Sequence, residues 1–327
     1  MKPKCLILVA GITAALNCAA FGQQDEKLGK LSFSTSCDPK VQAEFERGVA
    51  MIHSYWFLIA RRTFEGVLRQ DPNCAMAYWG IALDLLNNSL AVVPPRADAE
   101  AAWAALEKAR EIGAKTQRER DWIEALSAYY RDHDKTPVNA RLVAYNNAME
   151  QLTQRYPDDY EAQVFYALTL QASASPADTT YANQIKSAAI LEKLYDQNPQ
   201  HPGVTHFLIH AYDYHPLAEK GIPAARRYAG IAPAVPHARH MPSHIYSMTG
   251  LWERIDRVER FRARNPARLL SRGGFLGLRA LAACAGRQGQ GANRQITRHR
   301  RPRRSSHHVR QLHGQECHAG ALCARTR

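Results

Sequence analysis

Four histidines occur as two closely spaced pairs in the second half of the sequence. His206 and His210 lie four residues apart in T-H-F-L-I-H, and His240 and His244 lie four apart in H-M-P-S-H. Residues four apart share one face of a helix, so each pair can offer two imidazoles to one metal ion. Neutral imidazoles suit zinc, nickel or copper. The sequence therefore predicts a candidate metal site, with zinc as the possible cofactor, at His206, His210, His240 and His244.

The same residues also fit a protein-binding groove, and the sequence leaves both interpretations open. Asp213 and His237 are close enough along the chain to join the histidines. Pro242 is expected at the first position of a helix, which would leave His240 outside that helix and off the face of His244. Neither pair contains the Glu of H-E-x-x-H, the general base of a metallohydrolase. The sequence thus leaves catalysis uncertain and favours a binding protein.

The elements that position these residues are helices with a repeating pattern. Helical periodicity dominates from Val41 onward, and stretches with strand-like alternation are almost absent. One motif occurs four times. It consists of three residues separated by 4 and then 3 positions, with a proline 5 positions after the third. Its members are Ala60, Phe64, Val67 and Pro72; Tyr145, Met149, Leu152 and Pro157; Ser187, Leu191, Leu194 and Pro199; and Ala224, Tyr228, Ile231 and Pro236. Each motif predicts a helix that packs its apolar face on a partner helix and stops before the proline.

The terminating residues divide the chain into units of two helices. Pro72, Gly113, Pro157, Pro199 and Pro236 are 41, 44, 42 and 37 residues apart. Over about residues 40–252 the chain resembles the tetratricopeptide repeat (TPR) family, whose unit is a helix hairpin of about 34 residues. The resemblance implies an all-α, right-handed solenoid of antiparallel hairpins, with five hairpins and the start of a sixth. The longer units here depart from the usual period of that family.

Two segments carry a closer resemblance. D-P-N-C-A-M-A-Y-W-G (residues 71–80) and P-H-A-R-H-M-P-S-H-I-Y (residues 236–246) are similar to secreted bacterial TPR proteins, largely without assigned activity. This resemblance implies that the first helix of each hairpin lines a concave face and binds a partner protein or peptide there. The candidate groove residues are His206, His210, Asp213, His240, His244 and His53.

The N-terminus has the order of regions of a secretory signal peptide. M-K-P-K precedes an apolar run and then the small residues A-A-F-G, so residues 1–22 are predicted to be removed. The apolar run is too short to span a membrane. Residues 23–37 form a lead-in to the repeat domain, which we expect over residues 38–253. The protein is predicted to be exported, to the periplasm or the extracellular space, and its oligomeric state is unknown.

Cys37 and Cys74 are one repeat apart, each just before a predicted first helix. Equivalent helices of adjacent repeats pack side by side, so these two residues are expected to be neighbours. In an oxidising compartment they would form a disulfide. The alternative is a pair of small, partly buried free thiols.

The C-terminal segment, residues 254–327, differs in composition from the rest of the chain. It holds 18 of the 43 Lys+Arg residues and 3 of the 30 Asp+Glu, so the net charge of +13 comes from this segment. All 18 are Arg, and the segment has no Tyr or Trp. We interpret it as the product of a frameshift near Glu253, with a disordered basic extension as the alternative. Nucleic-acid binding is not expected, because the segment offers too few aromatic residues for base stacking.

Overall fold

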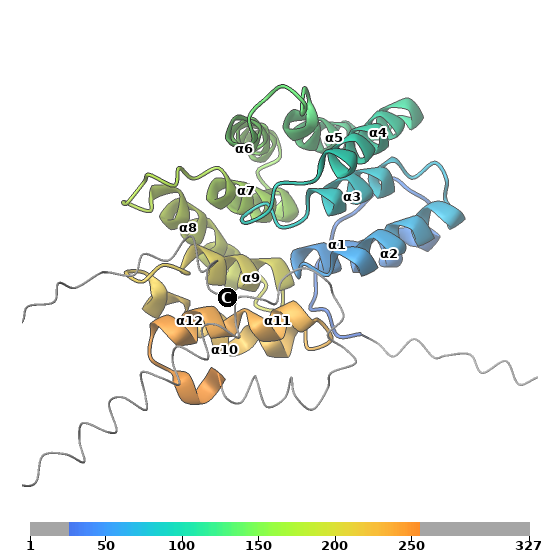
Figure 1. Cartoon of the computed structure of the whole chain (residues 1–327). Coiled ribbons are helices and arrows are strands. Elements are labelled where there is room, and N and C mark those ends of the chain that lie inside the picture. Colours follow the sequence, from blue (N-terminus) through green and yellow to red (C-terminus); the bar gives the residue numbers. More distant parts are fainter. Residues whose placement is uncertain (1–25, 256–327) are drawn as a thin grey trace, which may run out of the picture. The chain divides into compact units, whose positions relative to one another are not determined.

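The computed structural model describes residues 26–255, and the predicted signal peptide and nearly all of the Arg-rich segment lie outside them. Residues 26–255 are all-helical and contain no strand, as the sequence predicted. No helix in this part of the chain combines the length and the apolar character needed to cross a bilayer. The first ten α-helices form successive antiparallel pairs (Figure 1).

The five hairpins and the helices that follow them have these bounds. The hairpins are α1 (Gln42–His53) with α2 (Phe57–Gln70), α3 (Ala75–Leu86) with α4 (Arg96–Ile112), α5 (Gln117–Tyr130) with α6 (Val138–Arg155), α7 (Tyr160–Ala172) with α8 (Ala182–Gln197), and α9 (Pro202–Ala211) with α10 (Ile222–Ile231). Two short helices, α11 (Pro236–His240) and α12 (Pro242–Met248), come next. Short 3-10 turns, η1 (Pro39–Val41) and η2 (Ala218–Gly221), precede α1 and α10.

The recurring 4-3 motif marks the inner face of the second helices. Ala60, Phe64 and Val67 in α2 are completely buried, and the equivalent residues of α6, α8 and α10 are buried as well. The helices α2, α6 and α8 each end two residues before their predicted terminating proline. Gly113 ends α4 with a φ of 77°, a left-handed conformation that glycine adopts without a steric penalty. Pro236 differs, because it opens α11.

The first helices of the hairpins pack on one another as well as on their partners. α1 contacts α3, α3 contacts α5, and α7 contacts α9, as expected for stacked hairpins. α1 also packs on α9, so the first hairpin touches the fifth (Figure 1). In a solenoid each unit contacts only its neighbours, and this contact departs from that arrangement.

An aromatic core fills the space between several first helices. Phe33, from the lead-in segment, is completely buried, with its ring centroid 5.4 Å from that of Trp79 in α3 and 4.9 Å from that of Trp122 in α5. Trp79 and Trp122 also contact Phe165 of α7, at 6.0 and 5.6 Å. The lead-in segment therefore covers the surface of α3 and α5 around Trp79 and Trp122, which would otherwise be exposed.

The predicted disulfide between Cys37 and Cys74 is confirmed, with the two Cα atoms 4.9 Å apart. The backbone N–H of Asp38 donates to the carboxylate of Asp71 at 2.8 Å beside it. Both links hold the start of the first hairpin against the start of the second. Because both sulfurs are used in the bond, this pair offers no thiolate to a metal ion.

Candidate metal centre

Helix α9 carries His206 and His210. Pro202 occupies its first turn, and the His201 side chain accepts a hydrogen bond from the Val204 N–H and so caps the helix. Nearly every residue of α9 is buried, which explains its almost continuous apolar sequence. His206 is completely buried, and its ring centroid is 4.7 Å from that of His210. His206 and His210 thus share one face of α9, as predicted.

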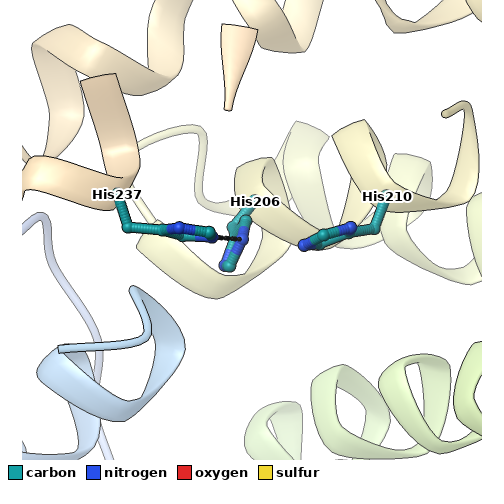
Figure 2. Close-up of side chains that lie close together, drawn as sticks. All are labelled: His206, His210 and His237. Atoms are coloured by element: carbon teal, nitrogen blue, oxygen red, sulfur yellow. Dashed lines mark hydrogen bonds between the residues drawn. The ribbon is translucent and has the colours of Figure 1, made fainter. Parts of the chain in front are cut away.

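The imidazole of His237, from α11, meets this face. Its Nε2 atom lies 3.0 Å from the Nε2 atom of His206, and Figure 2 shows His206 between His237 and His210. One ring nitrogen from each of the three histidines lies within 4.8 Å of the other two. We call His206, His210 and His237 the three-histidine cluster.

Hydrogen bonding determines which nitrogen of His206 carries the proton. Its Nδ1 atom lies 2.6 Å from the backbone carbonyl oxygen of His53. A carbonyl oxygen only accepts, so Nδ1 carries the proton and Nε2 keeps its lone pair. The Nε2 atom of His210 is buried without a hydrogen-bond partner among the described residues. The lone pair of His206 Nε2 therefore accepts a hydrogen bond from the Nε2–H group of His237 at 3.0 Å, and the nitrogen of the cluster that has no such partner is His210 Nε2.

Burial keeps these imidazoles uncharged at neutral pH. It lowers the pKa of His206 and of His237 well below the ordinary value, and the neighbouring imidazoles lower each further. Burial, together with His244, lowers the pKa of His210 to about 4. Neutral imidazole is the form that binds metal ions, so the cluster needs no deprotonation at pH 7.

Two tyrosine rings form walls of the cluster. Tyr55 follows the end of α1 with a φ of 54°, a conformation that is uncommon for a bulky residue. Its ring centroid lies 4.5 Å from that of His206 and 5.1 Å from that of His237. Tyr228 of α10 stacks on His206 with centroids 5.1 Å apart. These rings restrict both the orientation of His206 and the access of water.

The second predicted pair, His240 and His244, lies beside the cluster. Pro242 opens α12 as predicted, so the two histidines belong to different short helices. This break does not separate them, because their Nε2 atoms are 2.9 Å apart. The Nδ1 atom of His244 lies 2.7 Å from the carboxylate of Asp213. We call His240 and His244 the outer pair.

A second group of polar side chains is buried nearby. Glu161 of α7 accepts hydrogen bonds at 2.8 Å from His53 Nε2 and at 2.7 Å from His201 Nε2. All three side chains are at most 1% exposed. Burial by itself raises the pKa of the Glu161 carboxyl, but His201 and His53 outweigh it and lower this pKa to about 2. We call His53, Glu161 and His201 the buried triad.

The structure gives His53 a different role from the predicted one. It was predicted to line a partner-binding groove, but its side chain is completely buried in the triad, and its carbonyl oxygen orients His206. His206 is buried too, whereas His210, Asp213, His240 and His244 are partly exposed. Glu161 and His201 were not predicted from the sequence. No local signal marks them, since their partners are contributed by other helices.

Comparison with protein-family models gives no match, and comparison with curated protein sequences gives none either. The function is therefore argued from the geometry of the residues themselves.

Proposed function

We propose that this protein binds a divalent transition-metal ion, such as zinc, through His206, His210 and His237. The observation that carries the proposal is the convergence of three ring nitrogens within 4.8 Å, two of them 3.0 Å apart. Around a tetrahedral zinc ion with Zn–N bonds of about 2.0–2.1 Å, neighbouring ligand nitrogens are roughly 3.3 Å apart. The closest pair in the cluster is near this separation.

The chemistry of the ligands restricts the choice of ion. Three neutral nitrogen ligands suit zinc, copper or nickel, whereas calcium and magnesium require oxygen. The hydrogen bond from His206 Nδ1 to the His53 carbonyl fixes the tautomer, as outer partners of metal-bound histidines do. Three protein ligands leave a further coordination position for a water molecule or another ligand.

We place this site in an exported protein related to the TPR family. The signal-peptide pattern of residues 1–22 and the Cys37–Cys74 disulfide both support export, because disulfides persist in oxidising compartments. The buried 4-3 motif of the second helices supports a helical repeat. We also propose that the hairpins follow one another as a right-handed solenoid. The contact between α1 and α9 departs from the regular form of that architecture.

Binding of a partner polypeptide along the first helices has less support. His53 and His206, two of the predicted contact residues, are completely buried. Phe33 covers the first helices at Trp79 and Trp122. A partner protein or peptide could still reach the partly exposed outer pair.

Metal loading of the full-length protein tests the proposed site. Chelator-stripped protein would be titrated with Co²⁺, whose visible absorption reports nitrogen coordination, and metal content would be measured by mass spectrometry. Wild type should bind Co²⁺, and the double variant His210→Gln, His237→Gln should lose the ion bound by the cluster. His133→Gln, outside the cluster in the loop after α5, is the matched control. Binding that the double variant leaves unchanged would refute the site, provided circular dichroism shows all proteins folded.

A further inference from the structure

The outer pair repeats the arrangement of the three-histidine cluster. In both places the Nε2 atoms of two imidazoles form a hydrogen bond with each other, 3.0 Å long in the cluster and 2.9 Å long between His240 and His244. In both places one ring is fixed through Nδ1 by an oxygen, the His53 carbonyl for His206 and the Asp213 carboxylate for His244. An Nδ1–H group directed at a carboxylate leaves Nε2 with its lone pair.

We propose that a second divalent metal ion binds at His240 and His244, with Asp213 orienting His244, beside the ion of the three-histidine cluster. This inference extends the proposed function and rests on it. A carboxylate that accepts from Nδ1 while Nε2 binds the ion is a recurrent arrangement in zinc sites. Asp213 also supplies negative charge, which the three-histidine cluster lacks.

The two positions are adjacent. The ring centroid of His240 is 5.9 Å from that of His237, and the centroid of His244 is 6.4 Å from that of His210. Each outer imidazole thus neighbours one imidazole of the cluster. The five histidines form one continuous group on α9, α11 and α12, and Asp213 lies just beyond the end of α9.

The two positions differ in solvent access and in number of ligands. The side chains of His244 and Asp213 are 32% and 25% exposed, whereas His206 is completely buried. The outer pair supplies two imidazoles, so water or an exogenous ligand must complete the coordination. The outer ion therefore binds more weakly, exchanges faster and is removed first by a chelator.

Metal stoichiometry tests this inference separately from the proposed function. Stripped full-length protein would be titrated with Zn²⁺ by calorimetry, and bound zinc would be counted after gel filtration. Wild type and the control His133→Gln should bind two equivalents, the second more weakly. His240→Gln should bind one equivalent with the tighter affinity unchanged. Asp213→Ala should weaken only the second affinity, by roughly 10–100-fold.

The other outcomes are distinguishable. One equivalent in wild type that persists in His240→Gln and is lost in His237→Gln would overturn the second position and leave the proposed function standing. One equivalent that is lost in either variant would mean a single site, which also overturns the inference. No zinc bound by folded protein would refute both proposals.

Discussion

The buried triad and the three-histidine cluster both hold three ionisable side chains, and both involve His53. The His53 side chain belongs to the triad, and its carbonyl oxygen accepts from His206 of the cluster. In the triad a carboxylate accepts a hydrogen bond from each imidazole, so each of these bonds has a donor and an acceptor. In the cluster there is no carboxylate: His206 and His237 share one hydrogen bond between their Nε2 atoms, and His210 Nε2 has no hydrogen-bond partner among the described residues.

This difference separates a structural network from a ligand site. Buried polar groups are costly unless they are hydrogen-bonded. In the triad both Glu161 bonds are made and the Val204 N–H donates to His201 Nδ1, which leaves His53 Nδ1 as the triad nitrogen without a partner among the described residues. The cluster consists of imidazoles alone, one of its nitrogens, His210 Nε2, has no partner, and a metal cation is a ligand that three converging neutral imidazoles can bind together. Three close ionisable residues are therefore not enough to identify a metal site, and the balance of donors and acceptors decides.

The largest expected effect is the loss of stability when the acceptor of the triad is removed. Glu161→Ala would leave the imidazoles of His53 and His201 buried without their acceptor. Leaving a buried donor without its acceptor costs about 1–3 kcal/mol, and two donors lose their acceptor here, so we expect the free energy of unfolding to fall by about 2–6 kcal/mol in urea titrations. The matched change in the cluster, His237→Gln, should cost the metal-free protein much less. Equal losses in the two variants would contradict the distinction between the regions.

The second effect is a loss of stability in acid. The pKa of His210 is lowered to about 4 in the folded chain. Its imidazole therefore binds a proton below about pH 6.5 in the unfolded chain, but only below about pH 4 in the folded chain. Stability from this group is complete above pH 6.5 and falls by about 3 kcal/mol as pH decreases to 4. Urea unfolding of metal-free protein at several pH values would measure it.

A His210→Gln variant measures how much of this acid-dependent loss of stability comes from His210. His53, His206 and His237 also have lowered pKa values, so wild type alone cannot assign the slope. The variant should have a shallower decrease between pH 6.5 and 4. Glu161 contributes to stability in a lower pH range. Because its carboxyl pKa is lowered to about 2, its contribution to the free energy of unfolding is complete above about pH 4.5 and is lost as the pH falls towards 2. An unchanged slope in the variant would refute the assignment to His210.

The smallest effect concerns the packing of α9 on α1. A Cβ atom added to Gly203 would lie 2.4 Å from the Nδ1 atom of His53, so Gly203→Ala must displace that ring. Overpacking of a core typically costs about 1–3 kcal/mol. Gly230→Ala in α10 is the control, because a Cβ there has no neighbour within 4 Å, and it should be neutral or slightly stabilising. Equal melting temperatures of the two variants would show that this contact is unimportant.

Local spacing was sufficient to predict much of the helical architecture. The 4-3 motif predicted residues such as Phe64, Met149 and Tyr228 as an inner face, and all are buried. The neighbouring helix starts predicted the Cys37–Cys74 disulfide. The four-residue spacing also predicted that His206 and His210 share a face, because helical periodicity is a property of adjacent sequence.

The parts that the sequence did not predict depend on contacts between distant helices. The triad needs α1 to meet α7 and α9, which places His53 beside Glu161 from 108 positions further along the chain. The burial of His53 has the same origin. A repeat pattern describes how each hairpin packs on the next, and it contains no information about the closing contact of α1 with α9.

Location of bound zinc by anomalous diffraction tests the central claim most directly. Crystals of the zinc-loaded full-length protein would be measured above and below the zinc absorption edge. We expect an anomalous peak between the Nε2 atoms of His206 and His237, within bonding distance of His210, and no peak among the side chains of the buried triad. A peak in the buried triad, or zinc bound only away from the three-histidine cluster, would contradict it.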